Sequence, residues 1–107
     1  MCFVNYVRAE AVRWSDAEWP GWVEVHLRES DGTISILIDK APTFDYSGRL
    51  APDVEFPVEL EIPCDVLDPT VDEAGNQSVV VRLHFHVEDQ QGRGTFRVGE
   101  TDVASRQ

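Results

Sequence analysis

Basic residues are scarce in this sequence. Nine Lys and Arg stand against twenty Asp and Glu in 107 residues, which gives a formal net charge of -11. No Lys or Arg occurs between Arg49 and Arg82, a stretch that holds eight of the acids. Such a charge repels nucleic-acid phosphates and acidic lipid surfaces, and it accelerates encounter with a basic protein. We therefore expect no nucleic-acid or membrane partner, and we consider a basic protein the best match.

Long apolar runs and cysteines are also few. No segment approaches the ~20 consecutive apolar residues that a membrane helix needs. The N-terminal residues lack a basic leader followed by an apolar run. The two cysteines, Cys2 and Cys64, have no metal-ligand spacing. These observations predict a cytoplasmic protein with two reduced thiols rather than a disulfide.

Sequence periodicity predicts an all-β protein. The chain has the size of a single domain, here residues 1–107, with a tail from about residue 99 that we expect to fray. Alternating apolar and polar residues, bounded by turn-forming residues, predict strands over residues 4–14, 22–28, 33–39, 54–62, 78–88 and 95–98. The Asp31-Gly32 dipeptide predicts a hairpin between the second and third of these. We expect an antiparallel sandwich or a small, partly open barrel of about six strands.

The same patterns predict which side chains face the core and where the longer loops lie. The inward positions are Ile34, Ile36 and Ile38 in the third segment, and Val79, Val81, Leu83, Phe85 and Val87 in the fifth. Proline and glycine predict loops over residues 40–52 and 63–76. Because the first of these loops also carries aromatic residues, we expect it to be ordered.

The clearest strand pattern is also the most acidic. Apolar side chains occupy one parity of residues 54–62, and Glu55, Glu59 and Glu61 occupy the other. Pro57 cannot donate a ladder hydrogen bond, so we expect the strand to lie at a sheet edge or to be bulged. Outward glutamates on an edge strand prevent aggregation, which is an explanation of this acidic face that needs no partner.

Three histidines form a candidate metal site. His84 and His86 are two residues apart, so they would share one face of a strand. With His26 as a third ligand, or Glu88 in its place, they would hold zinc or another divalent metal. The alternative is a polar exterior face, which is the more common role of paired histidines on a solvated strand.

Tryptophans supply a second candidate site. Trp14, Trp19 and Trp22 lie within nine residues. Clustered aromatic residues anchor protein interfaces, but they also cover the open ends of small barrels. We find no cleft-forming carboxylate pair, calcium loop, activated nucleophile or phosphate-binding loop, so we expect neither a catalytic residue nor a bound cofactor.

Two short motifs resemble those of small uncharacterised bacterial all-β proteins. The residues that carry the resemblance are Pro20-Gly21-Trp22-Val23-Glu24-Val25 and Asp39-Lys40-Ala41-Pro42-Thr43-Phe44, on either side of Asp31-Gly32. The resemblance covers about the first half of the chain, and its motifs are structural. It implies a stand-alone bacterial cytoplasmic protein and assigns no activity.

These observations favour a non-enzymatic, acidic protein-binding domain, similar in action to immunity proteins or inhibitors. We expect it to recognise a basic partner through Glu55, Glu59 and Glu61, with Trp19 or Trp22 as an apolar contact. One alternative is a β-barrel that binds a metal or small ligand through His26, His84 and His86. Another is a homo-oligomeric structural module.

Overall fold

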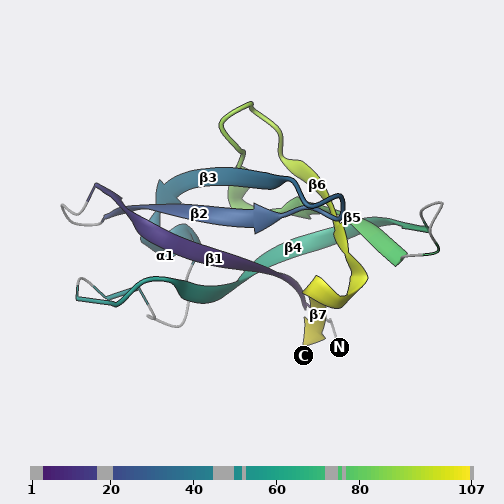
Figure 1. The fold of residues 1–107 in the computed structure, drawn as a ribbon, viewed down its shortest axis with the longest axis horizontal. Coiled ribbons are helices and arrows are strands. Elements are labelled where there is room, and N and C mark those ends of the chain that lie inside the picture. The colour runs from purple at the N-terminus through teal and green to yellow at the C-terminus, as the bar shows by residue number, and fades with distance from the viewer. Residues whose placement is uncertain are drawn as a thin grey trace.

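The computed structural model describes residues 4–16, 21–44, 50–51, 53–71, 75 and 77–106. Strands make up most of it (Figure 1). They are β1 (Val4–Asp16), β2 (Trp22–Arg28), β3 (Ile34–Lys40), β4 (Val58–Val71), β5 (Gln77–Leu83), β6 (Thr95–Gly99) and β7 (Val103–Arg106). One α-helical turn, α1 (Ala41–Phe44), follows β3, and two 3-10 turns, η1 (His84–His86) and η2 (Glu100–Asp102), follow β5 and β6.

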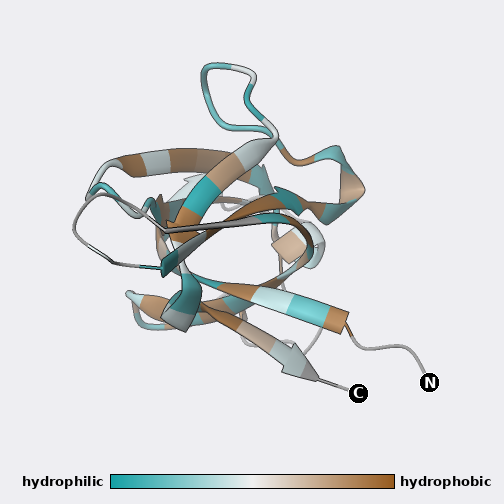
Figure 2. Ribbon diagram, turned by 90° about the vertical axis from the view of Figure 1, so that its right-hand side faces the viewer, coloured by the Kyte–Doolittle hydropathy of each residue, from teal (hydrophilic) through white to brown (hydrophobic). Residues whose placement is uncertain are grey.

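All the strands belong to one antiparallel sheet, in the order β3-β2-β1-β4-β5-β6. β7 pairs with the first residues of β1, where Val7 lies opposite Val103. β2 pairs with the second half of β1, from Glu10 opposite His26 onward. The sheet curls on itself (Figure 2), and the buried apolar side chains of its strands fill the interior. The all-β prediction is confirmed, and of the two expected architectures the partly open barrel is the one observed.

The segment between η1 and β6 closes part of the open side of the curl. Leu37 of β3 forms an isolated antiparallel bridge with Asp89. The Gln90 N–H donates to the carbonyl of Ile36 over 3.2 Å, and the Ser30 N–H donates to the carbonyl of Arg97 over 2.8 Å. Both β3 and β6 therefore have hydrogen bonds beyond those to their neighbour in the strand order.

Alternation along the strands builds a single core. Its largest fully buried side chains are Phe44, Phe96, Leu27, Leu37, Leu60 and Ile62. Phe44 comes from α1, so the predicted ordered loop contributes to the core itself. The Asp31-Gly32 hairpin is also confirmed, with β2 and β3 paired from Trp22–Lys40 to Arg28–Ile34.

The predicted inward face of β3 is wrong. Ser35 and Leu37 are buried, whereas Ile34 is exposed and Ile36 and Ile38 are half-buried. The reason is the pairing with β2, in which Leu37 lies opposite the fully buried Val25. Residues directly opposite in an antiparallel pair share a face. The three isoleucines therefore lie on the outer face.

The predicted edge position of the acidic strand is wrong as well. β4 begins at Val58, after Pro57, and lies between β1 and β5 in the middle of the sheet. It continues to Val71, through most of the predicted loop over residues 63–76. Pro63 is tolerated where the pairing with β5 ends, at Cys64 opposite Leu83. Pro69 lies beyond Cys64, the last β4 partner of the described part of β1.

Two further expectations fail near the C-terminal end. Strand β5 ends at Leu83, so Phe85 belongs to η1 and is 55% exposed instead of inward-facing. The tail that we expected to fray contains η2 and β7. β7 is held by four register pairs with β1, which explains its order.

Candidate functional site

The turn η1 presents an aromatic side chain to solvent. Its backbone departs from ordinary geometry, since Phe85 has φ 63° and ψ 25° and His86 has φ 57°. Two consecutive non-glycine residues in the left-handed region are rare, because Cβ approaches the following carbonyl oxygen. Phe85 is the most exposed of the large hydrophobic side chains in the described part of the chain.

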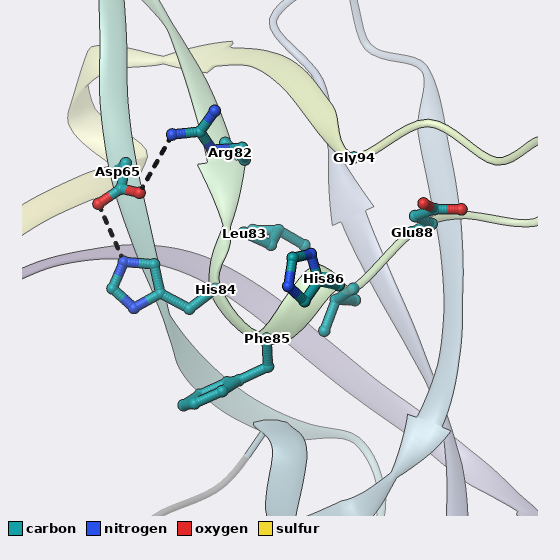
Figure 3. A pocket seen from close by; sticks show the side chains of 9 residues that line it. Asp65, Arg82, Leu83, His84, Phe85, His86, Glu88 and Gly94 are labelled. Atoms are coloured by element: carbon teal, nitrogen blue, oxygen red, sulfur yellow. Dashed lines mark hydrogen bonds and ion pairs between the residues drawn. The ribbon is translucent and has the colours of Figure 1, made fainter.

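A charged cluster supports one side of this turn. His84 Nε2 lies 3.0 Å from Asp65 Oδ1, and an Arg82 Nη lies 3.6 Å from Asp65 Oδ2 (Figure 3). The hydrogen bond with His84 lowers the pKa of Asp65 from its ordinary value, and Arg82 adds to this shift. Asp65 and Arg82 are directly opposite on β4 and β5, so the sheet itself positions the pair.

A surface depression of about 600 Å³ lies beside the turn. Its lining combines apolar, basic and acidic side chains from β4, β5, η1 and the segment that follows: Asp65, Arg82, Leu83, His84, Phe85, His86, Val87, Glu88 and Gly94. In Figure 3 the Asp65–His84 pair lies on one side of the depression and Glu88 on the other. This volume falls within the range of pockets that hold a small ligand or a partner's side chain.

The outer face of β1 and β4 carries the predicted glutamates of β4. Glu59 and Glu61 point to this face, and Glu59 lies directly opposite Glu10 of β1. Like charges opposite each other in a sheet repel. Arg8 moderates the repulsion, with its Nε 3.0 Å from Glu59 Oε1. We call Glu10, Glu59 and Glu61 the acidic face; the predicted Glu55 is exposed but precedes β4.

The tryptophans divide between two environments. Trp14 of β1 is half-buried and packs edge-on against Phe56, with ring centroids 5.8 Å apart. Trp22 is exposed at the start of β2, with Lys40 Nζ 6.0 Å from its ring centroid. Trp19 lies outside the described residues. Trp14 thus has a packing role, and Trp22 remains available as a surface contact.

The three predicted metal ligands lie in two places. His84 and His86 both line the depression beside η1. His26 instead lines a separate depression near Arg8 and Glu10, and its Nε2 lies 2.7 Å from Glu24 Oε2. Among the residues that the structure describes, no three His, Cys, Asp or Glu side chains are grouped closely enough to hold a metal ion.

Sequence reasoning missed a polar network that ties the segment after η1 to β3. The Arg93 guanidinium donates to Asp89 Oδ2 over 2.9 Å and to Ser35 Oγ over 2.8 Å, and it lies 3.3 Å from Glu29 Oε1. The Asp89 side chain is only 4% exposed. Burial raises its pKa, but hydrogen bonds from Arg93 and from the Gln91 N–H outweigh burial, and the net pKa is lowered. The Asp89/Arg93 spacing around Gly92 is the only sequence signal of this network.

Cys64 is unsuited to nucleophilic chemistry. It is a free thiol, 1% exposed, between Asn5 of β1 and Leu83 of β5. Burial, assisted by the charge of Asp65, raises its pKa to about 12. The thiolate is the reactive form of cysteine, so this side chain serves the core. Cys2 lies outside the described residues.

Comparison with protein-family models, curated proteins and solved structures found no match to this chain. In the described part of the chain, none of the helices has the length and apolar character required to cross a membrane.

Proposed function

We propose that this chain is a non-enzymatic, acidic domain of the bacterial cytoplasm that binds a basic protein through its acidic face. The observation that carries the proposal is the direct opposition of Glu10 and Glu59 on the outer face of a sheet whose chain bears a net charge of -11. A basic side chain placed between these carboxylates would relieve their repulsion, which gives the face a preference for cations.

The position of the face favours a protein partner. β1 and β4 are central strands, so their outer surface is rigid and held by neighbours on both sides. The Glu59 side chain is 64% exposed, which leaves it accessible although Arg8 contacts it. Exposed charges of this kind affect association rates and partner choice more than they affect stability.

Selection from a random peptide library displayed on phage tests the proposal. We expect the selected peptides to be basic. Their association rate with the protein, measured by surface plasmon resonance, should fall at least about tenfold between low and high NaCl, because salt screens charge steering. The variant Glu10→Gln/Glu59→Gln/Glu61→Gln should lose most of the binding.

A second triple variant controls for net charge. Asp31→Asn/Asp53→Asn/Glu100→Gln also removes three charges, from exposed positions outside the acidic face and outside β4, and should retain most of the affinity. Selected peptides that are neutral or acidic would contradict the proposal. Equal losses in the two triple variants would show that only net charge matters, and the acidic face would then have no special role.

A further inference from the structure

The chain interrupts a regular strand pattern to expose Phe85. Leu83 and Val87 are both buried, at 3% and 1% exposure, and a continuous strand would place Phe85 between them on the same inward parity. Instead η1 turns the ring outward, to 55% exposure, and the chain then returns Val87 to the core. Burial of the ring would have been the favourable outcome for a core that already holds Phe44 and Phe96.

The exposure of Phe85 is maintained against a backbone cost. Phe85 and His86 both have positive φ, a region that bulky L-residues avoid. Residues persist in such conformations only where the surrounding structure holds them, and these positions concentrate at ligand-binding sites. Here the flanking buried residues and the Asp65–His84 contact provide that support.

The ring of Phe85 is also oriented by a neighbour. The His84 and Phe85 rings lie edge to face, with centroids 6.1 Å apart and an interplanar angle of 87°. His84 is in turn fixed by Asp65. In Figure 3 the phenyl ring projects away from the Asp65–Arg82 pair. A pre-positioned aromatic side chain with few rotors loses little entropy on binding, as in the anchor residues of protein interfaces.

The charges around the ring select the chemistry of its ligand. Apart from its histidines, the charged residues that line the depression are Asp65, Glu88 and Arg82, so carboxylates outnumber guanidinium groups there. The Glu88 side chain is exposed, on the side of the depression opposite the Asp65–His84 pair. The face of an aromatic ring attracts cations, and Arg is its most frequent partner.

We propose that η1 is the aromatic anchor of the partner-binding surface, and that it receives an Arg side chain of the basic partner across the ring of Phe85. This inference rests on the proposed function. It extends the acidic face along β4, because Asp65 has the same parity as Glu59 and Glu61 and all three lie outward. The anchor is thus Phe85 in place of the predicted Trp19 or Trp22.

Nuclear magnetic resonance with a defined probe tests the anchor. The probe is the peptide acetyl-Gly-Arg-Gly-Arg-Gly-amide, and its control has citrulline, a neutral isostere, in place of each Arg. We expect amide shifts at residues 84–88 of the protein and upfield shifts of the Arg side-chain protons from the Phe85 ring current. Phe85→Leu, which keeps apolar bulk, should weaken binding about two- to fivefold, and Phe85→Tyr should retain it.

The outcomes separate the anchor from the acidic face. Shifts confined to the acidic face, with equal affinity for Phe85→Leu, would overturn the anchor and leave the proposed function intact. Shifts at residues 84–88 that persist at full strength in Glu10→Gln/Glu59→Gln/Glu61→Gln would support the anchor and contradict the acidic face. Equal binding of the citrulline peptide, or no binding of either peptide, would overturn the anchor.

Discussion

Steric contact between Cβ and the backbone should determine how substitutions of His86 change stability. At φ 57° any side chain approaches the next carbonyl oxygen, whereas glycine does not. We expect His86→Gly to be more stable than His86→Ala by about 0.5 to 1 kcal/mol, since relief of the left-handed strain exceeds the added chain entropy of glycine. Urea unfolding measures the difference.

Thr95 provides the matched control for His86. It lies exposed in the extended strand β6, where glycine has no steric advantage and weakens the strand. There the order should reverse, with Thr95→Ala the more stable variant. If alanine were the better residue at both positions, the left-handed geometry of η1 would be wrong.

Phe85 and His86 show which part of the candidate site the sequence does not predict. His84-Phe85-His86 contains no glycine or asparagine, the residues that favour positive φ, so the alternation predicts a strand to residue 88 with Phe85 facing inward. The predicted pairing of His84 and His86 on one strand face failed for the same reason. The sequence identifies the residues of the site but not the directions in which their side chains point, because those directions depend on a turn that tertiary contacts hold in place.

Strand β3 allows a test of side-chain register at the scale of one element. Leu37 is fully buried opposite Val25, and Ile36 is half-buried opposite His26. Leu37→Ala should reduce the free energy of unfolding by about 3 kcal/mol, because it removes methyl groups from a packed core and leaves a cavity. Ile36→Ala should cost less than about 1.5 kcal/mol. A larger loss for Ile36→Ala than for Leu37→Ala would contradict the observed register and support the one that the sequence predicted.

The β3 sequence is ambiguous in itself. Ile34-Ser35-Ile36-Leu37-Ile38 is apolar on one parity throughout and apolar at Leu37 on the other. Periodicity therefore predicts that the parity with the three isoleucines faces the core. The fold selects the other, because pairing with β2 and the Leu37–Asp89 bridge bring Leu37 inward. Single-strand patterns were sufficient where only one face was apolar, as in β2, and insufficient here.

The Asp89–Arg93 network should contribute to stability as one unit. Arg93→Met would leave the carboxylates of Asp89 and Glu29, 4% and 12% exposed, without their cation. We expect a measurable loss in the free energy of unfolding, smaller than for a fully buried pair because Arg93 is itself 43% exposed. Arg97→Met, at an exposed position of β6, should change stability by less than about 0.5 kcal/mol.

The network also predicts a pH dependence with a definite sign. The pKa of Asp89 is lowered in the folded state, so the unfolded chain binds its proton at higher pH. The stability that Asp89 contributes is present above its unfolded pKa and is lost as pH falls through the folded pKa. Urea unfolding between about pH 6 and pH 2 should therefore show a shallower acid loss for Asp89→Asn. The pH dependence of the free energy of unfolding that remains in this variant should come from groups such as Asp31 and Asp65, whose pKa values are also lowered.

The order of the strands in the sheet could not be predicted from the sequence. Pro63 and Pro69 indicated a loop, but β4 continues through both, because each lies where one neighbouring strand is absent from the described pairing. That absence is a property of the assembled sheet. The fold class needed only alternation and turns, so it was predictable; the central position of β4 and the pairing of β7 with β1 were not.

Charge is the other property that belongs to the whole molecule. With a net charge of -11, mutual repulsion of carboxylates favours the expanded, unfolded chain, and salt screens this repulsion. Raising NaCl from about 20 mM to about 500 mM should increase the free energy of unfolding in urea, a neutral denaturant, by on the order of 1 kcal/mol. The Glu10→Gln/Glu59→Gln/Glu61→Gln variant should gain less from salt, because it has already lost the repulsion between Glu10 and Glu59.

A decrease of stability with salt would instead mean that ion pairs such as Arg8–Glu59 and Arg93–Glu29 outweigh repulsion. The acidic face would then be balanced in the free protein, without the residual attraction for cations on which partner binding depends.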